Sequence, residues 1–249
     1  MRQNLYFGRG NAKVDALTFS LPCGHSCPFA KFCLAKLNPK TRKIESGKEA
    51  KIRCYAVNVE VLFPKIFDSR WRNLQLLKKC DKAGMVALLN KSIAKSRNPK
   101  VRIHASGDFF SQTYFDSWLE IAKLFPQKLF YGYTKALPFW IKRINDIPKN
   151  FKLVASKGGI CDNLIDKYHL PYVQVVFSQE EAKKLGLELD HDDSLAEKAD
   201  KSFAILLHGA QNKNTVAGKA WYKIMHSVGG YKTNYFLCYK KNKKDNNKK

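Results

Sequence analysis

Four of the seven cysteines in this 249-residue chain lie between Cys23 and Cys54, and they are the residues best suited to chemistry. Three residues separate Cys23 from Cys27, five separate Cys27 from Cys33, and Cys54 follows at a distance. Thiolates are soft ligands that select zinc or iron–sulfur clusters. The sequence therefore predicts a metal site in this segment.

The cysteine spacing does not identify the metal. It is neither the paired C-x2-C of zinc ribbons nor the C-x3-C-x2-C of standard radical-SAM enzymes. Cys27, Cys33 and Cys54 can hold a [4Fe-4S] cluster with one open iron, or all four cysteines can form a closed site. His25 can complete a zinc site with three of the cysteines. Unligated loop cysteines are the remaining interpretation. The chain shows no secretory signal, which argues against a disulfide framework.

Small or polar residues follow each predicted strand. The carboxyl ends of parallel strands are where α/β proteins place their sites. We therefore expect these residues to share one polar site: Ser20, Ser106-Gly107-Asp108, Thr134-Lys135, Ser156-Lys157, Ser178-Gln179 and His208-Gly209.

The elements that position these residues alternate along the chain. Apolar runs predict strands at 16–20, 101–106, 128–134, 151–156, 172–178 and 202–209. Helical spacing predicts helices within 56–95, 115–125, 137–146, 161–169, 179–187 and 215–227. This alternation predicts an α/β fold: a parallel (β/α)6-type partial barrel with an N-terminal cysteine-rich cluster loop at 21–56. We expect a single domain over residues 1–238 and a basic, disordered tail at 239–249.

The composition narrows the class of protein. Hydrophobic residues make up 45% of the chain, enough for a packed core. No apolar run approaches the roughly 20 residues of a membrane helix, so we expect a cytoplasmic protein. The net charge of +24 favours a phosphate-rich partner, either nucleic acid or a nucleotide. A lysine-rich composition without such a partner is the alternative.

The order of motifs is similar to that of radical-SAM proteins, in which a cluster loop follows the first strand and an acidic turn follows the second. Here Ser106, Gly107 and Asp108 form that turn. Asp108 can pair with the ammonium of S-adenosylmethionine, and Gly107 has no side chain to block a ligand. Ser156 and Lys157 could meet the carboxylate of S-adenosylmethionine. Asp108 and His208 are the candidates for catalytic residues.

Motifs along nearly the whole chain resemble the bacteriophage gene product 88 family. They are NAK, LPxGHxCPxAxxC, RCYA, RIHxSGDFFSQxYFxxW, FYGYTKxLPFW, LxHDDS and LLHGxQ. The family is uncharacterised, so the resemblance implies phage relatives and an infected host cell but no reaction. Cys27, Cys33 and Cys54 occupy its motif cysteines, whereas Cys23 stands where a small residue is usual. The resemblance favours a three-cysteine site.

Three functions remain open at this stage. The first is an iron–sulfur enzyme resembling radical-SAM proteins that acts on nucleic acid or nucleotides. The second is a non-catalytic nucleic-acid-binding protein with a structural zinc or a closed iron–sulfur site. The third is a nucleobase-exchange barrel enzyme without S-adenosylmethionine, in which Asp108 or Asp162 is the nucleophile.

Several other residues have more than one interpretation. His104 fits either a core position or the polar site. The cluster of Asp190, His191, Asp192 and Asp193 suits a cation, acid–base chemistry or a helix cap, of which we favour the cap. Tyr131 and Tyr133 share one face of a strand, where they could stack on a nucleobase.

Overall fold

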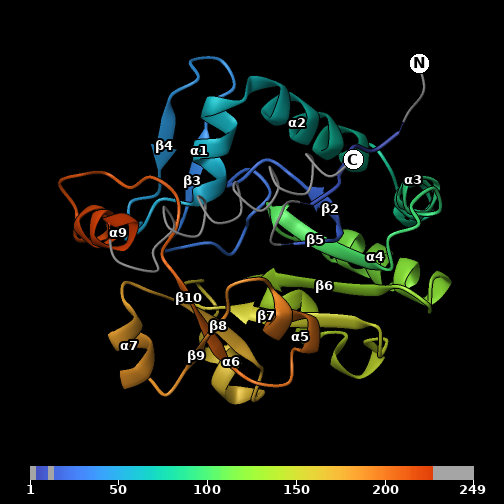
Figure 1. Ribbon diagram of the computed structural model, residues 1–249. Helices are drawn as coiled ribbons and strands as arrows, with labels where there is room; N and C mark the ends of the chain where they lie inside the picture. The colour runs from blue at the N-terminus through green and yellow to red at the C-terminus, as the bar shows by residue number, and fades with distance from the viewer. Residues whose placement is uncertain (1–3, 11–13, 227–249) are drawn as a thin grey trace, which may run out of the picture.

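The computed structural model describes residues 4–10 and 14–226, and its centre is an eight-stranded sheet (Figure 1). All neighbouring strands are parallel except the first pair. Across the sheet the strands are β1 (Phe7–Gly8), β2 (Leu17–Ser20), β5 (Lys100–Ser106), β6 (Leu129–Thr134), β7 (Phe151–Ser156), β8 (Tyr172–Val176), β10 (Phe203–Leu206) and β9 (Glu188–Leu189).

The predicted α/β class with a mostly parallel sheet is confirmed. The strands from β2 to β8 follow chain order across the sheet, as successive β/α units require. The sheet stays open in the described part of the chain, because β1 and β9 at its two edges pair with β2 and β10 respectively and not with each other. The sequence analysis did not predict these two short edge strands.

The helical character predicted within 56–95 is confirmed, and the segment divides into three helices. Pro64 begins the second of them, where its missing N–H costs nothing. Asp81 begins the third and accepts a hydrogen bond from the backbone N–H of Gly84 at 2.8 Å. The helices are α1 (Tyr55–Leu62), α2 (Pro64–Lys78), α3 (Lys82–Ile93), α4 (Gln112–Leu124), α5 (Leu137–Ile141), α6 (Asn163–Lys167), α7 (Gln179–Lys184), α8 (Ser194–Lys198) and α9 (Val216–His226).

Side chains alternate between the two faces of the sheet, as the strand period of two requires. On β5, Val101 and Ile103 join the main core, which α2 to α6 cover and which holds the fully buried Trp118. On β6, Tyr131 and Tyr133 point to the opposite face, which α8 covers at one end. The remainder of that face borders a cavity.

The predicted cysteine loop contains a short antiparallel hairpin of β3 (Ala35–Leu37) and β4 (Ile44–Ser46). This hairpin lies beside α1, above the sheet in the view of Figure 1. The predicted tail at 239–249 lies outside the described residues. None of the helices in the described ranges is long and apolar enough to span a bilayer.

Candidate functional site

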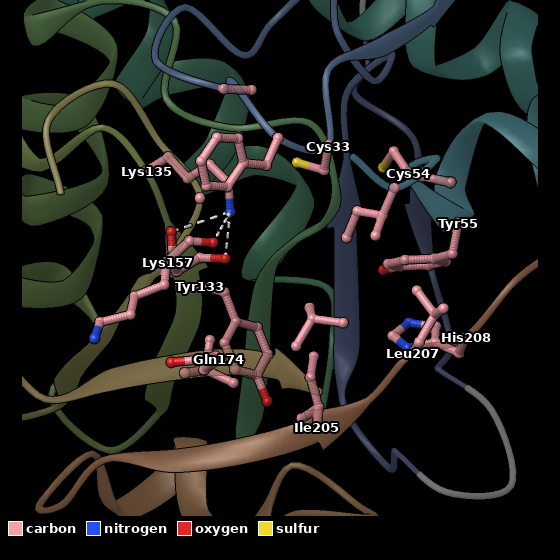
Figure 2. Close-up of a pocket in the computed structure, with 18 of the residues that line it drawn as sticks. Cys33, Cys54, Tyr55, Tyr133, Lys135, Lys157, Gln174, Ile205, Leu207 and His208 are labelled. Atoms are coloured by element: carbon pink, nitrogen blue, oxygen red, sulfur yellow. Dashed lines mark hydrogen bonds between the residues drawn. The ribbon is translucent and has the colours of Figure 1, made fainter. Parts of the chain in front are cut away.

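A cavity of about 620 Å³ lies between the sheet and the cysteine loop (Figure 2). This volume is within the range of cofactor and small-molecule sites. Most of the predicted site residues line it: Cys27, Cys33, Cys54, Ser106, Gly107, Asp108, Thr134, Lys135, Ser156, Lys157 and His208. The predicted residues that do not line it are Ser20, Cys23, Ser178, Gln179 and Gly209.

Three thiols from separate turns of the chain border this cavity. Cys27 and Cys33 belong to the loop after β2, and Cys54 immediately precedes α1. Burial raises the pKa of the Cys27 thiol, and the nearby negative charges of Asp108, Cys54 and Cys33 raise it further. Burial also raises the pKa of Cys33, although the positive charge of Lys135 partly opposes this. The thiols are therefore desolvated and electrostatically coupled to one another.

Within the described ranges, no three Cys, His, Asp or Glu side chains form a group that could hold a metal ion. His25 does not complete a zinc site, because its Nε2 lies 2.9 Å from the carbonyl oxygen of Leu37 and its ring packs against Trp71. The three thiols thus border one cavity without converging on a single point.

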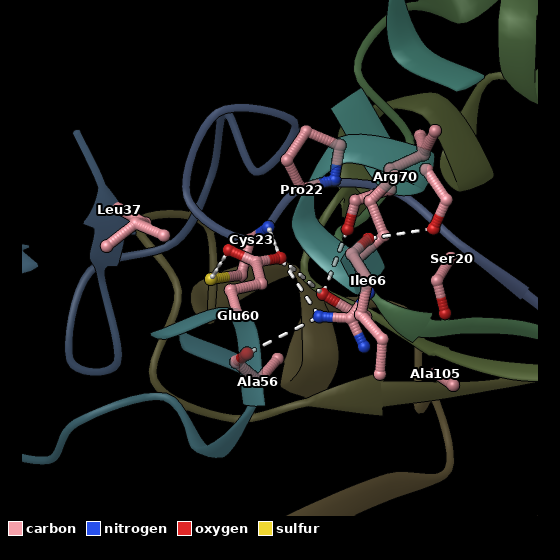
Figure 3. Close-up of polar contacts among 12 residues, drawn as sticks. Ser20, Pro22, Cys23, Leu37, Ala56, Glu60, Ile66, Arg70 and Ala105 are labelled. Atoms are coloured by element: carbon pink, nitrogen blue, oxygen red, sulfur yellow. Dashed lines mark hydrogen bonds and ion pairs between the residues drawn. The ribbon is translucent and has the colours of Figure 1, made fainter. Parts of the chain in front are cut away.

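Cys23 is fully buried and is not among the residues that line the cavity. Figure 3 shows Cys23 beside Glu60 and Arg70. Its backbone N–H and its thiol both donate to the carboxylate of Glu60, at 3.0 and 3.2 Å. The adjacent Cys23 thiol lowers the pKa of Cys54. Arg70 lies 2.9 Å from Glu60 and balances its charge. Cys23 therefore contacts the site through Cys54.

The turn after β5 places Asp108 at the cavity, but its carboxylate is already well satisfied. It accepts hydrogen bonds from the Thr134 hydroxyl at 2.6 Å and from the backbone N–H groups of Lys135 and Phe109, each at 2.8 Å. Burial raises the pKa of Asp108, and these hydrogen bonds oppose that effect. Asp108 therefore ties the end of β5 to the end of β6.

Gly107 lines the cavity and also has a packing role that the sequence did not predict. Its φ of +84° is in the left-handed region that favours glycine. A Cβ atom there would lie 2.5 Å from Ser26 Oγ and 2.7 Å from Leu21 Cβ. Packing against the cysteine loop, and not only access for a ligand, thus requires glycine at this position.

Lys135 lines the cavity, and its ammonium makes three hydrogen bonds there. The sequence predicted Lys135 only as one of the residues that follow a strand. Its Nζ donates to Ser156 Oγ at 2.6 Å and to the carbonyl oxygens of Ser156 and Lys157 at 3.0 and 3.2 Å (Figure 2). It therefore holds the end of β7 beside the end of β6. The Lys157 ammonium lies 4.0 Å from the ring centroid of Tyr172.

Two aromatic rings form the opposite wall. The rings of Tyr55 and His208 are 4.5 Å apart, and the Tyr55 hydroxyl donates to the carbonyl oxygen of Ala105. Tyr55 was not predicted as a site residue, although it directly follows Cys54. His208 Nδ1 lies 3.1 Å from the carbonyl oxygen of Leu206.

His104 is buried at the border of the cavity, and its ring packs into the core. Its φ of 61° is exceptional for a residue inside a strand, and it turns the ring toward Phe109 and Tyr114. His104 Nε2 lies 3.0 Å from the Tyr114 hydroxyl. Complete burial lowers the pKa of His104 to about 3, so the ring is neutral at physiological pH.

The favoured capping prediction holds for Asp192, whose side chain accepts a hydrogen bond from the backbone N–H of Ser194, the first residue of α8, at 3.1 Å, whereas the N-cap residue Asp193 makes no such bond. Asp193 has left-handed backbone geometry, with φ at 68°. Its carboxylate accepts a hydrogen bond from the Tyr133 hydroxyl at 2.8 Å and forms an ion pair with Arg102 at 3.0 Å. Arg102 was missed, although a charged residue within an apolar strand was a signal for it.

Comparison with known proteins supports the resemblance drawn from the motifs. The "Gene 88 protein" of Mycobacterium phage L5 is 28% identical over 190 residues, which cover 70% of this chain and 73% of that protein. The protein of the same description from Mycobacterium phage D29 is 27% identical over 190 residues, with 70% and 72% coverage. No solved structure matches. The Gene product 88 family matches residues 3–223, and the chain therefore belongs to this family.

Proposed function

We propose that this protein is an iron–sulfur enzyme that resembles radical-SAM proteins and acts on nucleic acid or nucleotides. One observation carries the proposal: three cysteine thiols border the same cavity as the polar turns that end β5, β6 and β7. In α/β proteins this end of a parallel sheet is where ligands bind. The same proposal holds that the sheet is a (β/α)6-type partial barrel and that the loop at 21–56 binds the cluster.

The number of thiols at the cavity is compatible with a cluster. In a four-iron cluster each thiolate binds a different iron. Cys27, Cys33 and Cys54 border one cavity and would supply three of these ligands. Three thiolates would leave the fourth iron without a protein ligand.

When bound, such a cluster supplies an open iron for S-adenosylmethionine and the electron for its reductive cleavage. The chain's own residues would orient the cofactor. Lys135 and Lys157 provide positive charge for a carboxylate near the ends of β6 and β7, and Ser156 holds Lys135 in place. Asp108 accepts a hydrogen bond from the backbone N–H of Lys135 and so holds the turn after β5 against the end of β6.

The test is iron and sulfide analysis of protein purified without oxygen, followed by electron paramagnetic resonance of the reduced protein with and without S-adenosylmethionine. We expect about four irons per chain and a spectrum that S-adenosylmethionine changes. Cys27→Ala, Cys33→Ala and Cys54→Ala should each lose iron, and Cys80→Ala, which changes a thiol outside the cavity, should retain it. Zinc alone, or full iron in all the variants, would overturn the proposal.

The other two functions receive less support from the site. The charge of +24 favours a nucleic-acid partner but does not distinguish binding from catalysis. Base exchange needs a carboxylate nucleophile. The Asp108 carboxylate accepts three hydrogen bonds, and that of Asp162 accepts the backbone N–H groups of Gly158 and Gly159 at 2.8 and 2.9 Å. Both carboxylates are thus engaged in holding turns of the backbone.

A further inference from the structure

A second groove lies along α9, outside the cavity described above. Its volume is about 470 Å³. We call it the α9 groove and define it by the side chains that line it, which are those of Gln211, Lys213, Lys219, Trp221, Tyr222 and Lys223. The function proposed above uses none of them.

All the charged side chains of the α9 groove are lysines. Lys213, Lys219 and Lys223 are exposed, and within the described ranges none of the three forms an ion pair with a carboxylate. Residues 203–226 contain no aspartate or glutamate that could neutralise them locally. The groove therefore carries unbalanced positive charge, which suits a polyanion.

This charge is local and does not reflect a uniformly lysine-rich surface. Residues 158–200, which include α6, α7 and α8, contain ten acidic and four basic residues. From residue 201 to the end of the chain, Asp245 is the single acidic residue. A composition that loaded every surface with lysine would not separate the charges in this way. The separation therefore favours a polyanionic partner at the α9 groove.

Aromatic rings lie among these lysines. Tyr222 is 62% exposed, and its ring centroid lies 4.1 Å from that of His226. Trp221 is half-buried and lines the same groove. Proteins that bind single-stranded nucleic acid combine aromatic rings, on which bases stack, with positive charges that follow the phosphates. The α9 groove holds both kinds of side chain.

A membrane surface fits this groove less well than a nucleic acid does. A helix that lies on a bilayer presents its apolar face to the lipid. Ala217 and Ile224 of α9 are instead buried in one apolar cluster with Leu207, which follows β10. Since the fold already covers this face, we favour a nucleic acid over a lipid surface.

The α9 groove adjoins the main cavity through Gln211. The Gln211 Oε1 accepts a hydrogen bond from the backbone N–H of Arg53 at 2.7 Å, and the Gln211 Nε2 donates to the carbonyl oxygen of Arg53 at 3.0 Å. Gln211 lines the groove, and Arg53 lines the cavity. A strand bound in the groove can therefore continue to the cavity past the half-buried Arg53.

We propose that the α9 groove binds a single-stranded nucleic acid and directs one of its nucleotides into the main cavity. The lysines bind phosphates, and Tyr222 stacks on a base. A single strand is required because the bases of a duplex are paired and stacked on one another, which hides their faces from Tyr222. This inference deepens the proposed function, on which it rests, by choosing a nucleic-acid strand over a free nucleotide.

Fluorescence anisotropy of the full chain with a labelled dodecamer of thymidylate tests the inference. The competitors are a dodecamer of uridylate, the duplex of the thymidylate dodecamer with deoxyadenylate, and free dTMP. They distinguish DNA from RNA and a strand from a nucleotide. We expect one of the two single strands to bind at least about tenfold more tightly than the duplex and than dTMP. Vesicles of phosphatidylserine are the competitor for a lipid surface and should not displace the strand.

The aromatic contact is tested by Tyr222→Ala, which should weaken binding of the strand roughly tenfold, because a base loses its stacking partner. Tyr6→Ala is the matched control, since Tyr6 is 61% exposed and lies outside the groove. This control should leave the affinity unchanged.

The phosphate contacts are tested by a triple variant with Lys213→Gln, Lys219→Gln and Lys223→Gln. The slope of log affinity against log salt concentration should become less steep by about 2, since each phosphate contact of a single strand contributes about 0.7. The matched control removes the same charge from exposed lysines of α7 and α8 and should leave the slope unchanged. Its substitutions are Lys183→Gln, Lys184→Gln and Lys198→Gln.

No binding, equal affinity for strand, duplex and dTMP, displacement of the strand by the vesicles, or equal losses in the variants and their controls would overturn the inference. The titration requires neither iron nor S-adenosylmethionine. Iron without strand binding would therefore refute the inference alone, and strand binding at the α9 groove without iron would refute the iron–sulfur proposal alone.

Discussion

Glu60 accepts two hydrogen bonds from Cys23, one from its backbone N–H at 3.0 Å and one from its thiol at 3.2 Å. Both residues are fully buried, and Arg70 balances the Glu60 charge at 2.9 Å. Cys23 is thereby held next to Cys54 and is not among the residues that line the cavity. This arrangement separates one supporting cysteine from the three that line the site.

The first prediction concerns the division of roles among the cysteines. Cys23→Ala should retain the iron of the anaerobically purified protein, whereas Cys54→Ala should lose most of it. The reason is that, of these two cysteines, Cys54 lines the cavity and Cys23 does not. The measurement is iron per chain after gel filtration. Equal loss of iron from both variants would make Cys23 a ligand and contradict the assignment.

The second prediction concerns the buried ion pair. Glu60→Gln leaves the Arg70 guanidinium buried without a countercharge and should lower the free energy of unfolding by about 3–5 kcal/mol. Asp68→Asn breaks the exposed pair with Arg42 and should cost at most about 1 kcal/mol. Urea denaturation measures both. A Glu60→Gln variant as stable as Asp68→Asn would show that the network contributes little.

The third prediction is a pH dependence from His104. The pKa is about 3 in the folded protein and about 6.5 in the unfolded chain, so below pH 6.5 the unfolded chain binds a proton that the folded protein does not. Stability is therefore highest above pH 6.5 and falls with pH toward 3. From pH 7 to 5 this single group should cost about 2 kcal/mol.

His104→Asn is the variant that tests it, because asparagine tolerates left-handed backbone geometry. Its unfolding free energy, measured by urea denaturation at pH 7 and pH 5, should change less than that of the unmodified chain by about 2 kcal/mol. Parallel pH profiles for the two proteins would be inconsistent with a neutral, buried His104.

The fourth prediction compares two glycines with positive φ. Gly186→Ala has no atom within 4 Å of the new Cβ, so it should cost only the left-handed strain of about 1–2 kcal/mol. Gly107→Ala adds close contacts with Ser26 and Leu21 and should cost roughly 3 kcal/mol or more. Thermal unfolding of both variants checks the difference. Equal losses would mean that the cysteine loop yields to the added methyl group.

The local pattern of apolar residues predicted most strands of the sheet. The strand predicted at 151–156 coincides with β7, and the strand predicted at 101–106 differs from β5 by one residue. Such apolar runs and helical spacings depend on near neighbours in the chain, which is why they can be read without the fold. The residues that follow the strands at 101–106, 128–134 and 151–156 meet at the cavity because strand direction places them on one edge, whereas Ser20, Ser178 and Gln179 do not line it.

The sequence by itself thus determined the α/β class, the main strands and the residue types available at their carboxyl ends. Only the tertiary structure decided which side chains reach the cavity. Cys54 lines the cavity and Cys23 does not, because the Cys23 thiol donates a hydrogen bond to the buried carboxylate of Glu60. Arg102 and Asp193 form an ion pair across 90 intervening residues, and no local spacing encodes such a pairing. Side-chain direction depends on the backbone path and on long-range packing, which the full fold alone sets.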